Sequence, residues 1–187
     1  MDVDETERMI RALLDAGVDS IATNGTLGEM ATLTLDEWKT FASVVAETVR
    51  AYNPDFPLFI GATTLNTRET IDRMRFLRDL KVPGVLLGRP MWVEMTPAAM
   101  VRFYRDIAEA VPELAICVYD NTAAFRGIIP TSVYAELADI PQIVAVKYAG
   151  AAPNGYRFHN ALRAVRGKIR LLPIECIWFI AYSLYGD

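Results

Sequence analysis

The chain has 187 residues, 52% of them hydrophobic, and a formal net charge of −4. This length and balance predict one globular domain with a sizeable core, and the lack of a basic block argues against nucleic acid as a partner. No apolar run approaches the length of a membrane span, and the acidic residues 1–5 lack the basic start of a signal peptide. The cysteines (Cys117 and Cys176) lie in apolar runs, which favours reduced thiols in a cytoplasmic protein, and a single histidine argues against a zinc site.

The hydrophobic pattern predicts helices and strands that alternate along the chain. Apolar residues at helical spacing predict helices over 3–16, 35–51, 67–80, 96–111, 131–138 and 153–165, and the start of another over 175–185. Short apolar runs between them predict six strands, over 20–24, 58–62, 84–87, 114–119, 143–147 and 169–173. The helix starts carry recognisable caps: Thr34 with Glu37 in a capping box, Thr67, and Thr96 followed by Pro97.

This alternation predicts a parallel sheet with crossover helices, in either a doubly wound open sheet or a (β/α)8 TIM barrel. The glycine fingerprint of the open sheet is missing after the first predicted strand. Polar side chains instead recur just after the strands, as on the carboxyl face of a barrel: Thr26, Thr63, Arg89, Trp92, Tyr119, Asn121 and Lys147. Since only six strands are predicted, we expect residues 1–187 to form a single partial barrel domain, with about six of eight βα units. That domain would lack the first strand and the last strand with the C-terminal helices.

Lys147 ends the fifth predicted strand, directly after the apolar run 143–146. Lysine is rarely buried, because desolvating an ammonium is costly, and burial favours the neutral amine that forms Schiff bases with carbonyl substrates. The alternative is a strand-end lysine that points into water. Tyr119 ends the neighbouring predicted strand, so its phenol is expected beside the amine, where it could move protons. Tyrosine is also common at strand ends simply because it is amphipathic.

Several loop residues could bind a substrate. The backbone of Gly25–Glu29 could form an anion site suited to a carboxylate, or a tight turn that needs glycine. Trp92 could be an aromatic wall for a flat substrate, or part of the core. Arg89 and Arg126 could contact an anion, although a solvated arginine is the commoner case. His159 is expected on a helix away from the strand ends, as a surface or packing residue.

Together these residues resemble the dihydrodipicolinate synthase/N-acetylneuraminate lyase family of class I, Schiff-base-forming (β/α)8 pyruvate aldolases. The resemblance rests on Gly25-Thr26-Leu27-Gly28-Glu29, on Tyr119, and on Lys147 at 28 residues beyond it. Within the family, residues 24–34, 88–92, and Tyr119-Asp120-Asn121 followed by Ala124-Phe125 are similar to the trans-o-hydroxybenzylidenepyruvate hydratase-aldolase branch. Leu27 departs from the synthases, which have a second threonine there, and Thr122 stands where the branch commonly has proline.

The resemblance implies a lyase that converts aryl-substituted unsaturated 2-oxo acids and water to an aromatic aldehyde and pyruvate, in aromatic hydrocarbon degradation. It implies no metal and no diffusible cofactor, because the lysine itself supplies the electrophile, and it implies a homotetramer. Alternatives are a dihydrodipicolinate synthase or another pyruvate-dependent aldolase of the family, and a non-catalytic fragment.

The resemblance also implies a role for each site residue. Lys147 would form the Schiff base, and Tyr119 would shuttle protons. The substrate would be bound by the Thr26 and Leu27 backbone with the Thr26 hydroxyl (at its carboxylate), by Asn121 (at the added water or hydroxyl) and by Trp92 (at the aryl group).

Overall fold

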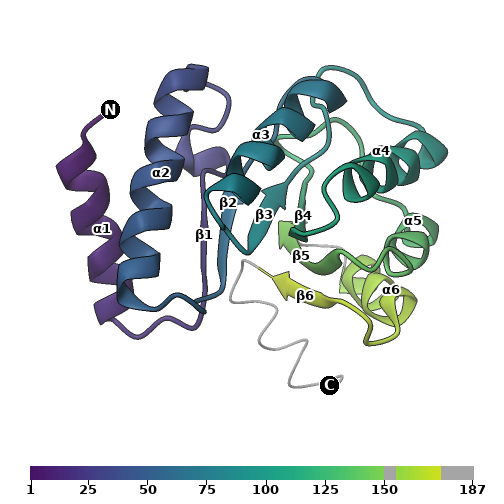
Figure 1. Ribbon diagram of the computed structural model, residues 1–187. Coiled ribbons are helices and arrows are strands. Elements are labelled where there is room, and N and C mark those ends of the chain that lie inside the picture. Colours follow the sequence, from purple (N-terminus) through teal and green to yellow (C-terminus); the bar gives the residue numbers. More distant parts are fainter. Residues whose placement is uncertain (150–154, 174–187) are drawn as a thin grey trace.

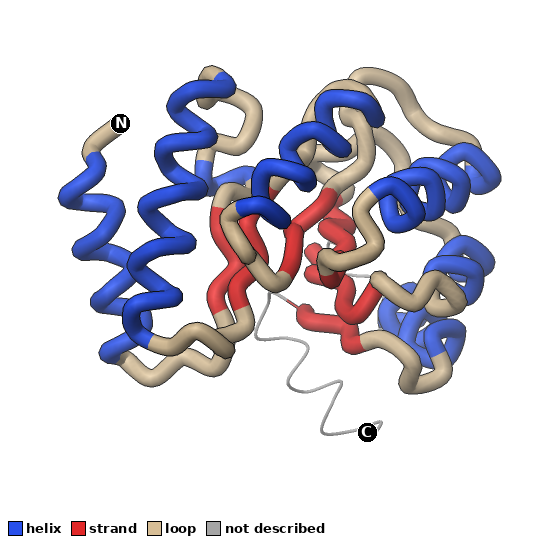
Figure 2. The backbone as a smooth tube through the Cα atoms, in the orientation of Figure 1, coloured by secondary structure: helices blue, strands red, loops and turns tan. Residues whose placement is uncertain are grey.

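The computed structural model describes residues 1–149 and 155–173, which form a curved six-stranded sheet with helices packed around it (Figures 1 and 2). The strands are all parallel, in chain order: β1 (Ile21–Thr23), β2 (Leu58–Gly61), β3 (Gly84–Leu87), β4 (Ala115–Asn121), β5 (Ile143–Ala149) and β6 (Arg170–Pro173). The helices are α1 (Val3–Asp15), α2 (Leu35–Tyr52), α3 (Thr67–Asp79), α4 (Pro97–Ala110), α5 (Thr131–Leu137) and α6 (Gly155–Val165), with a short 3₁₀ helix, η1, over Thr26–Gly28. Parallel strands in sequential order with alternating helices are the arrangement of a partial (β/α)8 barrel, which confirms the predicted fold class.

The sheet separates two layers of apolar side chains. The larger layer lies between the sheet and the helices, and it takes Val118 from β4 and Tyr148 from β5. The smaller layer contains no helical residue and lies on the inner face of the sheet, where β4 contributes Cys117 and Tyr119. Because side chains alternate along a strand, Lys147, which pairs with Tyr119 in the ladder, belongs to the same inner face.

The helix starts follow the predicted capping chemistry, with one exception. Thr34 and Glu37 form the capping box of α2, and Thr96 caps α4 with proline in its first turn, as predicted. The prediction that Thr67 caps α3 is wrong, because Asn66 is the cap and its side chain accepts from the Glu69 backbone N–H at 2.9 Å. Asparagine is among the preferred cap residues, and here it stands one position earlier than the threonine.

The two central strands are longer than predicted. Tyr119 and Lys147 were expected to end their strands, but each is followed by two further strand residues, and the ladder continues from Asp120 with Tyr148 to Asn121 with Ala149. The extension places Asn121 on the same face as Tyr119. Cys176, the predicted helix over 175–185 and the first residues of the predicted helix over 153–165 lie outside the described residues.

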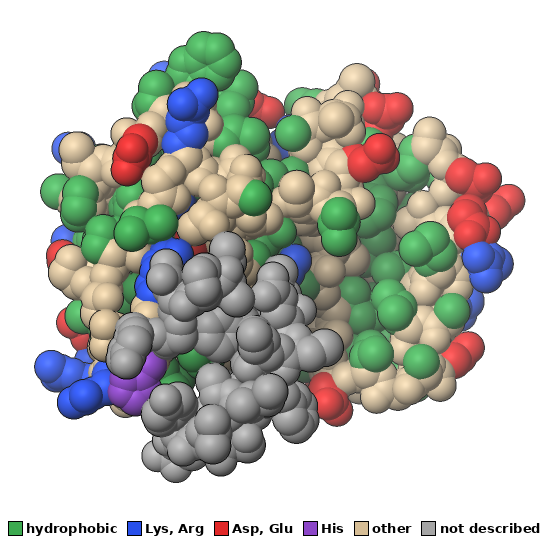
Figure 3. Space-filling model, turned by 180° about the vertical axis from the view of Figure 1, so that it is seen from behind, with side chains coloured by type: hydrophobic (Ala, Val, Ile, Leu, Met, Phe, Trp, Pro, Cys, Tyr) green, Lys and Arg blue, Asp and Glu red, His purple; other side chains and the backbone are tan. Residues whose placement is uncertain are grey.

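Charged side chains do not gather in a single patch on the described part of the face shown in Figure 3. On the described part of the face seen from behind in Figure 3, acidic and basic groups are interspersed with hydrophobic ones. Within 1–149 and 155–173, no helix has the length and apolar character needed to cross a membrane.

Candidate active site

The predicted lysine–tyrosine pair is present on the inner face of the sheet. Tyr119 of β4 and Lys147 of β5 are direct partners in the parallel ladder. The Lys147 Nζ lies 4.3 Å from the centre of the Tyr119 ring, a distance at which an ammonium is attracted to the ring face. Tyr119 is buried, and Lys147 is half-buried. The geometry therefore brings an amine and a phenol together from neighbouring strands, as expected from sequence.

The Tyr119 hydroxyl is the centre of a small hydrogen-bond network. It lies 3.1 Å from the Thr26 hydroxyl, and the Asn121 side-chain amide donates to it at 3.0 Å. The same amide also donates to the Thr26 hydroxyl at 3.2 Å. Burial raises the pKa of Tyr119, but the hydrogen bonds with Thr26 and Asn121 and the positive charge of Lys147 outweigh it, so the pKa lies below the ordinary value for tyrosine. A phenol with a lowered pKa is better suited to take and return a proton near neutral pH.

Gly25 opens space next to this network. A Cβ built on Gly25 would lie 3.4 Å from Tyr119 Cε1 and 3.6 Å from Lys147 Nζ. The loop is held by Asn24, which adopts a left-handed conformation with φ of 52° and donates from its side chain to the Gly28 carbonyl at 2.8 Å. Its own carbonyl lies against Gly61, where a Cβ would come within 2.1 Å. Asn24 and Gly61 therefore fix the path by which the first loop reaches the lysine.

The other residues predicted from the sequence differ in position and in burial. Thr26 and Leu27 are both exposed, and the Leu27 side chain makes no packing contribution to the core, which leaves its backbone as the group that could meet a ligand. Trp92 lies between β3 and α4 and is 76% exposed, so the core-packing interpretation of this residue is wrong. Arg126 is exposed, and His159 is half-buried on α6.

Arg89 differs from its prediction. A solvated arginine was the commoner expectation, but Arg89 is fully buried and its guanidinium pairs with the equally buried Asp120 at 3.4 Å. Asp120 also accepts from the Tyr134 hydroxyl at 2.6 Å and from Arg157 at 3.0 Å. Asp120 lies just beyond the strand that was predicted over 114–119, and no role was predicted for it. The sequence did contain one signal, a carboxylate directly between Tyr119 and Asn121. An acid on a buried strand needs charged or hydrogen-bonding partners, so its position indicates that such partners lie nearby in the fold.

This arrangement is suited to chemistry on a carbonyl compound. An amine, a phenol with a lowered pKa and two further polar groups converge on one space, and buried apolar side chains line the rest of the inner face. Within the described parts of the chain, no group of three or more His, Cys, Asp or Glu side chains could hold a metal ion.

The curved parallel sheet defines this chain as a partial (β/α)8 barrel with a lysine–tyrosine pair on its inner face. More particularly, the chain belongs to the Dihydrodipicolinate synthetase family, whose family model matches residues 1–171.

Two relatives and one solved structure show which members of the family this chain resembles. The trans-2'-carboxybenzalpyruvate hydratase-aldolase of Nocardioides sp. (strain KP7) is 44% identical over 178 residues, which are 95% of this chain and 53% of the relative. The trans-O-hydroxybenzylidenepyruvate hydratase-aldolase of Pseudomonas putida is 47% identical over 150 residues, which are 80% of this chain and 44% of the relative. A solved structure, described as PhdJ bound to substrate intermediate, has a TM-score of 0.93 and 46% identity, and the match covers 99% of this chain and 56% of that one. The chain thus spans about half the length of the proteins it matches.

Proposed function

We propose that this chain carries the active site of a Schiff-base-forming hydratase-aldolase. The substrate would be a trans-o-hydroxybenzylidenepyruvate-type aryl 2-oxo acid, and the products would be an aromatic aldehyde and pyruvate. The observation that carries the proposal is the Lys147 amine at 4.3 Å from the Tyr119 ring, with the Tyr119 hydroxyl bonded to Thr26 and Asn121. The similarity to two named hydratase-aldolases over most of the chain supports this choice of substrate class.

The reaction begins at Lys147. As a neutral amine it attacks the ketone carbon of the 2-oxo acid, and loss of the ketone oxygen as water leaves an iminium. The iminium withdraws electrons from the conjugated double bond, so that water adds its oxygen to the carbon bearing the aryl group while the neighbouring carbon takes a proton. Removal of the proton from the new hydroxyl then breaks the bond between these two carbons. The aldehyde leaves, the electron pair of the broken bond forms the carbon–carbon double bond of an enamine, and the nitrogen of Lys147 regains its lone pair.

The last steps restore the enzyme. The enamine takes a proton on carbon, and hydrolysis of the resulting iminium releases pyruvate and the free amine. Tyr119 is our candidate for each proton transfer at the reacting oxygens, since its hydroxyl can both donate and accept and its ring lies 4.3 Å from the amine. The Thr26 hydroxyl with the Thr26 and Leu27 backbone would hold the carboxylate, Asn121 the added hydroxyl, and Trp92 would flank the aryl ring. In this proposal the chemistry needs no metal or diffusible cofactor.

A pyruvate-condensing synthase, or another pyruvate-dependent aldolase, is the second candidate, because its first step would use the same lysine. Leu27 in place of a second threonine, and an exposed aromatic Trp92 on the loop that follows β3, favour the aryl substrate instead. A non-catalytic fragment is the third candidate, since the chain spans about half of its relatives. We further propose that residues 1–187 act as one partial-barrel domain of a cytoplasmic homo-oligomer, a tetramer by family resemblance.

The test is turnover of the aryl substrate. Incubation with o-hydroxybenzylidenepyruvate should release salicylaldehyde and pyruvate in equal amounts, and Lys147→Met should abolish both. Release with the wild type but equally with Lys147→Met would contradict the proposed nucleophile. No release with this substrate, together with condensation of pyruvate and aspartate semialdehyde, would favour the synthase.

A further inference from the structure

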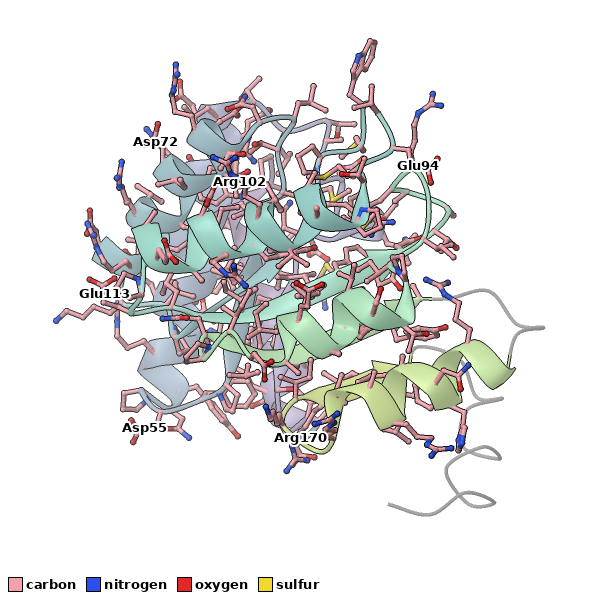
Figure 4. The ribbon with its side chains drawn as sticks, turned by 90° about the vertical axis from the view of Figure 1, so that its right-hand side faces the viewer. Asp55, Asp72, Glu94, Arg102, Glu113 and Arg170 are labelled. Atoms are coloured by element: carbon pink, nitrogen blue, oxygen red, sulfur yellow. The ribbon has the colours of Figure 1, made fainter. Side chains whose placement is uncertain are left out.

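Two loops at the carboxyl end of the sheet contact each other. One connects β3 to α4 (residues 88–96) and carries Trp92, and the other connects β4 to α5 (residues 122–130) and follows Asn121. At the start of the first loop, Gly88 lies against the ring of Phe125, where a Cβ would come within 2.0 Å of Phe125 Cζ. Farther along, the Glu94 carboxylate lies against Gly127, where a Cβ would come within 2.6 Å of Glu94 Oε1. Figure 4 shows Glu94 at this end of the molecule, with Glu113, beyond the far end of α4, at the opposite end.

Arg89 also joins these loops. Its guanidinium donates to the Gly127 carbonyl at 2.6 Å and to the Arg126 carbonyl at 3.4 Å, and it pairs with the Asp120 carboxylate at 3.4 Å. It also lies 5.6 Å from the centre of the Phe125 ring. The fixed planar fork of arginine can meet several acceptors at once, whereas a lysine ammonium is a point charge on a flexible stem.

The contacts of Arg89 lead directly to the proposed acid–base residue. Phe125 packs edge-on against Tyr119 with ring centres 5.5 Å apart. Asp120 stands in β4 between Tyr119 and Asn121, so the position of its carboxylate fixes the two neighbouring side chains on the other face of the strand. Arg89, which is fully buried, therefore contacts both Asp120, which lies between Tyr119 and Asn121 in the strand, and Phe125, which packs against Tyr119.

We propose that Arg89 is a positioning residue, which holds the Trp92 loop (residues 88–96) in a fixed position relative to Tyr119 and Asn121. It thereby determines how efficiently a substrate with an aryl group is converted. This inference rests on the proposed function. The pyruvoyl half would be held elsewhere, by Lys147 on β5 and by the Thr26 loop after β1. Loss of the Arg89 contacts should therefore impair conversion of an aryl 2-oxo acid more than Schiff-base formation with pyruvate alone.

The experiment compares Arg89→Lys with Arg102→Lys in the full chain. Arg102 is 82% exposed on α4 (labelled in Figure 4), which makes it a matched control for the loss of a guanidinium. The first readout is hydrogen–deuterium exchange of the amides in 88–96 and 122–130, which requires no activity. The second is the ratio of kcat/KM for o-hydroxybenzylidenepyruvate to the rate at which borohydride traps pyruvate on the protein.

We expect Arg89→Lys to speed exchange in both loops on the order of tenfold, the equivalent of one charge-assisted hydrogen bond, with no change in β5. It should lower kcat/KM for the aryl substrate about 10²-fold, as small misplacements do, with trapping within about twofold of wild type; Arg102→Lys should change neither. Unchanged exchange in both loops, or equal losses of trapping and aryl turnover, would overturn the proposal. If Arg89→Lys fails to fold, Phe125→Leu carries the test, because it keeps the ion pair but removes the ring shared by Arg89 and Tyr119. If the wild type neither traps pyruvate nor turns over the aryl substrate, the proposed function is refuted. The exchange rates of the two loops then still decide whether Arg89 holds these loops in place.

Discussion

Gly25→Ala separates catalysis from stability at this site. The backbone of Gly25 has φ of −83° and ψ of −160°, which alanine adopts without strain. The new methyl would meet Tyr119, Leu86 and Lys147 at 3.4–3.6 Å, all ordinary contacts. The free energy of unfolding should therefore stay constant or rise by about 0.4–1 kcal/mol, because alanine restricts the unfolded chain.

The same methyl should nevertheless slow the chemistry. A substrate carbon has to approach Lys147 Nζ from about 3–3.5 Å to covalent distance, and the methyl would occupy space 3.6 Å from that nitrogen. We expect borohydride trapping of pyruvate to slow by about 10²-fold, measured by intact mass against time. Gly28→Ala is the matched control, because a Cβ there meets nothing within 4 Å. If Gly25→Ala trapped pyruvate as fast as Gly28→Ala, the reacting carbon would not enter beside Gly25 and the assigned geometry would be refuted.

Three further outcomes follow from the structure. Tyr119→Phe should lower kcat by about 10²–10⁴-fold, and an unchanged kcat would remove the phenol from the mechanism. Because hydrogen bonds and the Lys147 charge lower the pKa of Tyr119 despite burial, the wild-type rate should rise with pH through a pKa below the ordinary value of about 10. A rise that persists unchanged in the variant would show that the phenol is not its source. Trp92→Ala should raise KM for the aryl substrate while leaving thermal stability and pyruvate trapping unchanged, since Trp92 is 76% exposed. Burial raises the pKa of the Cys117 thiol to about 11, although nearby Lys147 opposes this. The neutral thiol therefore contributes fully to the free energy of unfolding below the unfolded-state pKa of about 8.5, and this contribution is lost as the pH rises to about 11. Over this range, urea unfolding should show that the free energy of unfolding falls by about 2–3 kcal/mol more in the wild type than in Cys117→Ala.

The sheet and its central pair could be predicted because both depend on local pattern. Alternating apolar runs and capped helices identify a parallel α/β chain, and in such a sheet the residues near neighbouring strand ends meet at one edge. That reasoning was enough to place Tyr119 beside Lys147. Strand ends were less accurate, because the β4–β5 ladder continues through Asp120, a residue that looks like a loop residue when only the sequence is read.

The buried polar cluster could not be predicted, because its members come from distant parts of the chain. Asp120 is neutralised by Arg89, 31 residues before it, and by Arg157, 37 residues after it. No local pattern distinguishes such arginines from solvated ones. Burial of a charge becomes tolerable only when the complete set of partners is present, and that condition is met by the tertiary fold alone.

A Schiff base between Lys147 and a 2-oxo acid can be trapped by reduction. The wild-type chain is incubated with pyruvate and borohydride, digested and mapped by mass spectrometry, with Lys147→Met treated in parallel. A reduced pyruvate adduct on the peptide containing Lys147, and none on the variant, is the predicted result. An unmodified Lys147, or an adduct that persists at another lysine in the variant, would contradict the assignment of Lys147 as the nucleophile.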